Sequence, residues 1–593
     1  MRRFSLSVVF LMSFSLLFWV ACSSSDPEGQ DAGVDAVSDA GQDAGEDAGV
    51  DAGEDAGLDA GEDAGGDEGP QVRELQAQVL LGEGGFFGTS GVVIGADRGF
   101  AIGGHYAPMI SGLQGGRVYL FGLGAWPAEL SDASLVLEAP DGAEQAALGY
   151  ALSPACDIDG DGFLDLPVGS HLFSPSTELA ASGRILVFWG NESGIDPAAP
   201  SILRLDDSLR ARFDSMGQCV LCADFDGDGF GDVMAGGQNA GADDTGLAAI
   251  WSGSAEGLDE LPDLLLTPPV TANRQYLGAT RLWADLNGDG EEDLAVGAWG
   301  LIKGDLPEDV HTGGLVLFYG GDDWSAGSSR ILVPPDDDPL NMGSEFILAG
   351  ELLAVGASDY ASCEGTGEMG SCCRVAQPCN EGLDCYQGFD HGLCSQACDV
   401  EACPADSECI TVTSMGEEHQ QCLLICEEGV SDCPAGGACT PASDALSVCV
   451  PGMAPGAVYV YRTGSEAALD AAPQRLDAPD NMNGAGFGQT LAFVPDFFGE
   501  GQGALLAGMK YADAGGAVAV YPMAEDGQSF MPVLPELMRA PEPMDWDSYG
   551  GNITYLGDID GDGLGDFFVG IDSHIEGDPY DDGIQTGGVV FYR

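Results

Sequence analysis

The chain has 593 residues, long enough for several ordinary domains or one large repeat array. Its 19 Lys and Arg stand against 97 Asp and Glu, a formal net charge of −78, which argues against nucleic acid as a partner because too few basic residues exist to neutralise phosphates. Hydrophobic residues make up 45%, so the chain as a whole is not disordered. The 18 Cys, most of them crowded into one stretch, indicate an oxidising compartment.

Residues 1–21 predict an export signal, because two arginines precede an apolar run that ends in a small residue before Cys22. The segment Trp19-Val-Ala-Cys22 resembles the lipobox of bacterial lipoproteins, although Trp19 stands where that family usually has Leu. The resemblance implies cleavage before Cys22, lipidation of Cys22 and, since Ser23 follows, an outer-membrane or cell-surface lipoprotein. The alternative is an uncleaved anchor, because a run of this length could just span a bilayer.

Residues 22–70 predict an extended acidic tether. The segment repeats Asp-Ala-Gly, and 26–70 contains 16 Asp or Glu and no Lys or Arg. Without apolar periodicity no core can form, and like charges extend the chain. The reading of this segment as a solvated spacer is favoured over a weak calcium-binding polymer.

Four acidic loops share the pattern Asp-x-Asp/Asn-Gly-Asp-Gly-x-x-Asp. Oxygen atoms at positions 1, 3, 5, 7 (backbone) and 9 suit a hard cation such as Ca²⁺. The Glu that an EF-hand places at position 12 is replaced by an apolar residue, and an apolar strand follows, so the loops are expected in β-hairpins. Merely acidic turns are the alternative. The predicted ligands are Asp157, Asp159, Asp161, Phe163 and Asp165; Asp224, Asp226, Asp228, Phe230 and Asp232; Asp285, Asn287, Asp289, Glu291 and Asp293; and Asp558, Asp560, Asp562, Leu564 and Asp566.

Each loop lies in a longer repeat of four strands, whose third strand is apolar and begins with Gly, as in Gly183-Arg-Ile-Leu-Val-Phe188. Three further copies, at 86–121, 342–461 and 486–521, lack the acidic loop. Seven copies with a period near 60 residues predict radial repetition.

These copies resemble the FG-GAP repeat of integrin α-subunit propellers and of many bacterial surface proteins. The traces are Phe86-Phe87-Gly88, Phe487-Gly488, Gly297-Ala298 and Gly356-Ala357, and the resemblance covers 72–593 apart from one insert. It implies an all-β, seven-bladed β-propeller that holds up to four structural Ca²⁺ ions. The copy near Asp496 has lost the ligands, so no ion is expected there.

The two ends of the array predict how the ring closes. The seventh copy stops at Arg593 after its third strand, while an unpaired strand stands at the start, over 74–81. This N-terminal strand is therefore expected to complete the last blade and to hide the sheet edges.

A cysteine-rich insert, 359–455, divides the propeller into 71–358, which holds blades 1–4 and the first part of blade 5, and 456–593, which holds the rest. The insert contains 14 Cys and predicts up to seven disulfides of unknown connectivity, with zinc as the weaker alternative. Outside it, Cys156, Cys219 and Cys222 lie beside the first two acidic loops, where one pair is expected to bridge and to leave one thiol.

In integrin-type propellers the acidic loops occupy one face and the ligand the other, so the resemblance places the insert on the binding face. The residue two positions after the Gly that ends each second strand is expected to ring the mouth of the central channel there. A mixed ring of aromatic and polar groups suits a glycan or protein ligand. Solvated loop residues, or a transition-metal site of two His and one Asp, are the alternatives. The ring residues are His105, His171, Gln238, Trp299, Ser358, Lys510 and Asp572.

No catalytic motif stands out in the sequence. We therefore expect a non-enzyme: a calcium-binding, lipid-anchored cell-surface adhesion module that recognises a glycan or protein ligand on the face opposite the calcium loops. A carbohydrate-active enzyme, a polysaccharide hydrolase or lyase built on the propeller, is the alternative. A purely structural scaffold without a ligand is a third reading.

Overall fold

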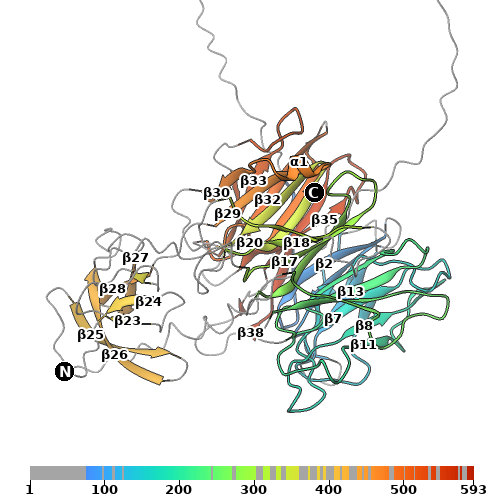
Figure 1. Ribbon diagram of the computed structural model, residues 1–593, viewed down its shortest axis with the longest axis horizontal. Coiled ribbons are helices and arrows are strands. Elements are labelled where there is room, and N and C mark those ends of the chain that lie inside the picture. The colour runs from blue at the N-terminus through green and yellow to red at the C-terminus, as the bar shows by residue number, and fades with distance from the viewer. Residues whose placement is uncertain are drawn as a thin grey trace, which may run out of the picture.

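A computed structural model shows the chain as a ring of four-stranded antiparallel sheets (Figure 1). Within 359–455 the structure describes only the strands named below. Elsewhere it describes residues 75–593 apart from 96–98, 110–113, 123–125, 242–244, 270–274, 302–311, 321–328, 336–341, 480–485, 500, 513–514, 532–535, 542–547, 572–574 and 577–583.

Seven sheets form the blades, each in the order first to fourth strand from the centre outward. Blades 1 to 3 are β2 (Phe87–Gly95), β3 (Gly99–Gly104), β4 (Arg117–Phe121) and β5 (Leu135–Leu137); β6 (Leu148–Leu152), β7 (Leu166–Ser170), β8 (Ile185–Phe188) and β11 (Ser201–Leu203); and β12 (Cys219–Ala223), β13 (Asp232–Gly237), β14 (Leu247–Trp251) and β15 (Leu264–Leu266).

Blades 4 to 7 repeat this order. They are β16 (Leu277–Ala284), β17 (Asp293–Ala298), β18 (Leu315–Phe318) and β19 (Ser329–Leu332); β20 (Met342–Ala349), β21 (Leu352–Ala357), β29 (Ala457–Arg462) and β30 (Gln474–Asp477); β31 (Leu491–Gly499), β32 (Gln502–Met509), β33 (Ala517–Pro522) and β34 (Glu536–Met538); and β35 (Tyr549–Gly557), β36 (Asp566–Ile571), β39 (Gly588–Tyr592) and β1 (Ala77–Leu81).

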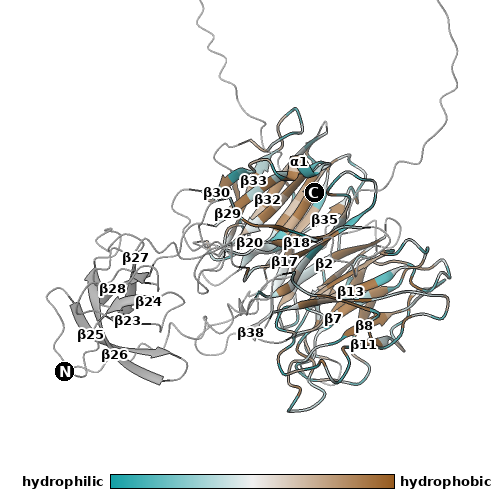
Figure 2. Cartoon of the chain, in the orientation of Figure 1, coloured by the Kyte–Doolittle hydropathy of each residue, from teal (hydrophilic) through white to brown (hydrophobic). Residues whose placement is uncertain are grey.

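The inner strands are apolar at successive positions because neighbouring blades cover both of their faces. In β8 and β14 every residue is buried, whereas the outer strands β5 and β11 bury only their last residue. Figure 2 shows the same contrast as brown strands within a paler and teal periphery. Seven hydrophobic cores result, one between each pair of adjacent blades, and the last of them joins blade 7 to blade 1.

A glycine contact repeats at all seven blade interfaces. A Cβ at the second-strand Gly169 would overlap the carbonyl oxygen of Gly217 in the next blade, and the equivalent overlap recurs round the ring to Gly570 against Gly88. Any larger residue would therefore push the blades apart. The glycines of the repeat signature thus set the distance between blades.

The N-terminal strand closes the ring as expected. Strand β1 pairs antiparallel with β39, from Ala77 opposite Tyr592 to Leu81 opposite Gly588, and Leu80 lies in the core between blades 7 and 1. A parallel bridge between Phe87 and Gly587 joins the two ends of the array.

A buried arginine connects three consecutive blades. Arg281 on β16 donates from Nε to the carbonyl of Val220 at 3.0 Å and from Nη2 to the carbonyl of Leu152 at 3.5 Å. Burial lowers the pKa of Arg281 to about 10, while the charge of the buried Glu345 on β20 acts in the opposite direction. One side chain thus bonds strands of blades 2 and 3 from blade 4.

The cysteine-rich insert leaves blade 5 and returns to it, because β21, which precedes the insert in sequence, pairs with β29, which follows it. Its strands form a three-stranded and a four-stranded sheet, and its predicted disulfides lie outside the described side chains. The strands are β22 (Cys372–Cys373), β23 (Asp384–Tyr386), β24 (Gly392–Ser395), β25 (Ser407–Ser414), β26 (Glu417–Cys426), β27 (Gly437–Ser443) and β28 (Leu446–Pro451).

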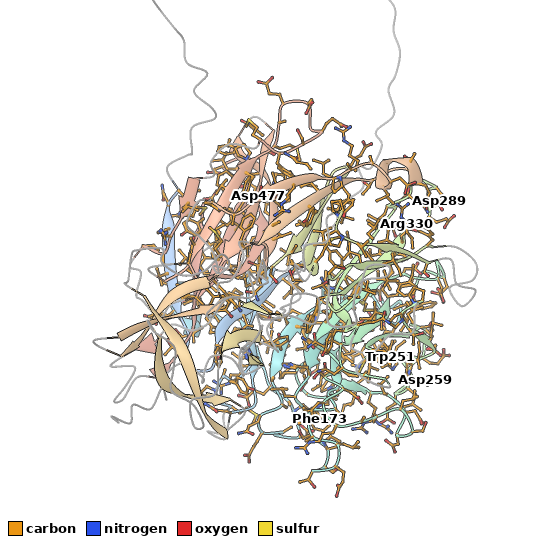
Figure 3. All side chains as sticks on the ribbon, turned by 60° about the vertical axis from the view of Figure 1, so that its left-hand side comes forward. Phe173, Trp251, Asp259, Asp289, Arg330 and Asp477 are labelled. Atoms are coloured by element: carbon orange, nitrogen blue, oxygen red, sulfur yellow. A yellow bond between two sulfur atoms is a disulfide. The ribbon has the colours of Figure 1, made fainter. Side chains whose placement is uncertain are left out.

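The remaining elements are short. The helix α1 (Glu466–Leu469) follows β29, and Arg330 of β19 bonds Asp470 just after it at 2.7 Å; Figure 3 labels this arginine. The others are η2 (Leu130–Asp132), β9 (Gly190–Asn191), β10 (Gly194–Ile195), β37 (Ile575–Glu576) and β38 (Ile584–Gln585). Among the described residues, no helix has both the length and the apolar character needed to cross a membrane.

Candidate functional site

The four acidic loops connect the first and second strands of blades 2, 3, 4 and 7, so they lie in β-hairpins as the sequence predicts. In Figure 3, Asp289 of the third loop projects at the periphery of the molecule. All four loops therefore occupy the same end of their blades.

The loops share one hydrogen-bond pattern. The N–H of the Gly at position 6 donates to the Asp at position 1, from Gly162 to Asp157 at 3.0 Å and from Gly563 to Asp558 at 2.9 Å, for example. The glycines at positions 4 and 6 both have positive φ, 73° and 88° at Gly160 and Gly162. This left-handed backbone turns successive carboxylates toward the same point.

The aspartate at position 9 anchors each loop to its blade. Asp165 accepts from the N–H of Ile158 at 2.9 Å and from that of Gly190, beyond the third strand, at 2.7 Å. Asp232 and Asp293 make the equivalent pair of bonds. Burial raises the pKa of Asp165 to about 6, and the nearby carboxylates of its loop add to the effect. Burial likewise raises the pKa of Asp232 and Asp566 to about 6.

The donor set fits a hard cation. In three loops, carboxylate oxygens of three aspartates lie within 4.8 Å of one another: Asp157, Asp159 and Asp165; Asp224, Asp226 and Asp232; and Asp558, Asp560 and Asp562. The loop at 285–293 has Asn287 in place of one of these carboxylates. One oxygen of Asp157 and one of Asp566 are buried without a hydrogen-bond partner. A divalent cation would satisfy these oxygens and reduce the repulsion among the carboxylates.

A disulfide joins the first two loops. Cys156, directly before loop 1, bonds Cys222 on β12, two residues before loop 2. The N–H of Gly231 in loop 2 also donates to the carbonyl of Asp157 at 2.8 Å. The expected bridge is therefore confirmed. The expected leftover thiol is wrong, because Cys219 is also disulfide-bonded.

The hairpin of blade 6 has no comparable cluster. Among the described residues, Asp496 accepts a hydrogen bond from the N–H of Gly501 at 2.5 Å. It belongs to none of the carboxylate clusters that the described residues form. Its φ is positive, 55°, and β32 begins at Gln502, so the loop is shorter than the acidic loops.

The predicted ring residues directly follow the second strands, at the end of the blades opposite the acidic loops. Most of them are buried rather than solvated: the exposed fraction is 3% for His105, 2% for His171, 1% for Gln238 and 5% for Lys510. Ser358 is at the limit of burial and Trp299 is half-buried. Asp572 and the predicted lipidation site Cys22 lie outside the described residues.

Two of the ring histidines belong to one aromatic cluster over blades 1 and 2. The ring of Tyr150 lies 5.3 Å from His105 and 4.0 Å from His171, and Phe86 stacks on His105 at 5.0 Å. Nδ1 of His105 lies 2.9 Å from Oγ1 of Thr89, whereas Nδ1 of His171 is buried without a partner. Burial lowers the pKa of His171 to about 3.

A second cluster covers blades 3 and 4. Trp299 donates from Nε1 to Oε1 of Gln238 at 3.0 Å, and Tyr276 stacks on Trp299 with ring centroids 4.1 Å apart and planes 4° apart. Lys510 of blade 6 lies apart from both clusters, with Nζ 4.9 Å from the ring centroid of Tyr511.

Sequence reasoning did not single out Tyr150 and Tyr276, the aromatic partners of the predicted ring residues. The signal was present, because each stands one or two residues from the apolar-Gly pair that opens a blade, at Leu148-Gly149 and Leu277-Gly278. Phe86 was noted only as part of the repeat signature.

Comparison with known proteins bears on the fold. Human integrin alpha-IIb is 32% identical over 161 residues, which is 26% of this chain and 15% of that protein. The fold is an FG-GAP-type propeller. Gallus gallus integrin alpha-V is 31% identical over 167 residues, 26% of this chain and 15% of that protein. No family model matches the chain.

An enzyme also shares similarity with this FG-GAP propeller. Phosphatidylinositol-glycan-specific phospholipase D of Bos taurus is 31% identical over 193 residues, 30% of this chain and 21% of that enzyme. The matched segments span about a fifth or less of these relatives.

Proposed function

We propose that the chain is an exported, lipid-anchored adhesion module that binds its ligand at one end of a calcium-stabilised propeller. The observation that carries the proposal is that the two ends of the blades carry different kinds of side chain. Four acidic loops, three of them with converging carboxylates, lie at one end of the blades, and two clusters of aromatic and polar side chains lie at the other end. The similarity to integrin alpha chains supports a propeller that binds.

The calcium ions have a structural role in this account. Each loop joins the first two strands of its blade, and its position-9 aspartate also bonds backbone near the third strand in blades 2, 3 and 4. Up to four Ca²⁺ would offset +8 of the −78 charge. Removal of the ions should therefore lower the stability of the blades, because the ions have a structural and not a catalytic role.

The anchor follows from the N-terminal sequence, in which Cys22 carries the lipid and 22–70 acts as the spacer. Radiolabelled palmitate should label the full chain expressed in a bacterial host, and Cys22→Ala should abolish the label. Label retained in the Cys22→Ala variant, or none in either protein, would contradict the anchor.

Binding is tested with the full chain applied to intact cells and to isolated cell-envelope polysaccharide and protein fractions, in calcium and in EGTA. We expect saturable binding that calcium strengthens. Absence of binding to every fraction would support the scaffold reading and overturn the proposal.

The same incubations test the absence of catalysis. We expect no new reducing ends and no unsaturated sugars in the polysaccharide fractions. Release of either product would establish the carbohydrate-active enzyme instead.

A further inference from the structure

The blades can be compared with one another at one backbone position that is strained in most of them. The residue before the apolar-Gly pair that opens a blade has a left-handed conformation in five blades, with φ between 56° and 74°. This conformation favours Gly and disfavours bulky side chains. The residues are Phe86, Ala147, Ser215, Tyr276 and Gly486.

Three blades meet this requirement with Ala, Ser or Gly, so the fold does not need a large side chain there. Blades 1 and 4 nevertheless place aromatic rings at the position. Each ring stacks on the residue that follows the second strand of its own blade: Phe86 on His105, with planes 19° apart, and Tyr276 on Trp299, with planes 4° apart. Phe86, Tyr276 and Trp299 are half-buried, and thus partly open to solvent at this end of the blades.

Polar groups accompany both stacks. Beside the first lies His171, which is 2% exposed and whose Nδ1 has no hydrogen-bond partner in the part of the chain that the structure describes. Beside the second lies Gln238, whose Oε1 holds the Trp299 indole in place. An unpartnered buried ring nitrogen is costly unless another molecule satisfies it.

The clusters contain no Asp, Glu, Lys or Arg, although acidic residues dominate the chain as a whole. Phe86, His105, Tyr106, Tyr150 and His171 make up the first, and Gln238, Tyr276 and Trp299 the second. A charged ligand would lose hydration here without meeting an opposite charge among the described residues of the two clusters. An uncharged sugar presents both an apolar C–H face for the rings and hydroxyl groups for the imidazole and amide.

We propose that the channel mouth over blades 1–4 binds an uncharged oligosaccharide, with the Phe86–His105 and Tyr276–Trp299 stacks as platforms for its sugar rings. The proposal rests on the proposed function and names the ligand class of the same site. Two platforms on separate pairs of blades suit a ligand of repeating units.

The test measures binding of the full chain, in saturating calcium, to uncharged glucose, galactose, mannose and xylose oligosaccharides and to acidic uronate polymers. The variants are Phe86→Ala and Tyr276→Ala, which introduce the residue that blade 2 already has at this position, so the backbone tolerates them. The control is Phe213→Ala. Phe213 also has a positive φ, 69°, and is 45% exposed, but it belongs to neither cluster.

We expect at least one uncharged oligosaccharide to bind, each mouth variant to weaken it about tenfold or more, and the control to leave it unchanged. An unchanged melting temperature in each variant verifies that the fold is intact. Binding of uncharged sugar that both mouth variants leave intact would overturn the site.

Binding only to acidic polymers or to a protein would overturn the ligand class while the adhesion function stands. Binding to none of these sugars and to none of the cell-envelope fractions would overturn both.

Discussion

Single residues are central to the proposed binding of cations by the acidic loops. Asp165 shows why: it anchors loop 1 through two backbone N–H groups, and burial among other carboxylates raises its pKa to about 6. An ion is the natural counter-charge for a group in this position. The loop pattern predicted which residues would be ligands, a prediction that binding has still to test, but not that the ninth residue would be buried.

Asp165→Asn should weaken calcium binding at loop 1, because an amide carries no charge. With calcium at about 100 times the dissociation constant, loss of one site should lower the free energy of unfolding by about 2.7 kcal/mol. Denaturant unfolding in calcium and in EGTA measures the effect. Asp496→Asn in blade 6 is the matched control and should lose nothing; equal losses in the two variants would contradict the assignment.

His171 should make stability depend on pH. Burial lowers its pKa to about 3 from 6.5, so between these pH values the folded chain binds fewer protons than the unfolded chain. The free energy of unfolding should therefore rise with pH across this window, by at most about 1.4 kcal/mol per pH unit from this residue, and level off above it.

Unfolding of the wild type and of His171→Gln at pH 5 and pH 7.5 in saturating calcium tests the histidine. The variant should show a smaller difference between the two pH values. His105 keeps a contribution of its own, because burial, and secondarily His171, lowers its pKa. Identical differences in the two proteins would show that His171 is not buried in its neutral form.

At the scale of elements, the pattern of apolar strands predicted the strands of the blades but not the short elements between them. The fourth strands that the repeat predicts are present in blades 1 and 2 as β5 and β11, each only three residues long. The four-residue helix α1 was missed, although Ser465 is an N-cap that accepts a bond from Ala468. So short a helix has no apolar periodicity to detect; it depends on tertiary contacts.

The disulfide between Cys156 and Cys222 ties two blades together across loops 1 and 2. The double variant Cys156→Ala/Cys222→Ala should lower the free energy of unfolding by about 2–4 kcal/mol, since the cross-link constrains the unfolded chain. Calorimetry in calcium and in EGTA should show the larger loss in EGTA, where no ion holds the loops. A melting temperature that matches the wild type in both buffers would contradict this coupling.

At the scale of the whole molecule, stability depends on closing a ring whose ends are far apart in sequence. Strand β1 supplies the outer edge of blade 7 and the buried Leu80. The closure was predictable from sequence because the seventh repeat contains three strands of its own and one further strand precedes the first repeat. The burial of the mouth residues was not, because it arises from packing between blades that no single repeat encodes.

Deletion of 22–81 should lower the melting temperature by at least about 5 °C, because it exposes the edge of β39 and removes a buried leucine. Deletion of 22–70 is the control and should change it little, since the first strand of the ring begins only at Ala77. Thermal melting of the two truncated chains decides the matter; equal melting temperatures would show that β1 does not close the propeller.

The most direct test of the account is thermal unfolding of the full chain in saturating Ca²⁺ and in excess EGTA, followed by circular dichroism. We predict a β-rich spectrum in both buffers at low temperature and a clearly higher melting temperature in calcium, since each ion bound at about 100 times its dissociation constant adds about 2.7 kcal/mol to stability. An identical melting curve in the two buffers would contradict the claim that the four acidic loops stabilise this propeller by binding calcium.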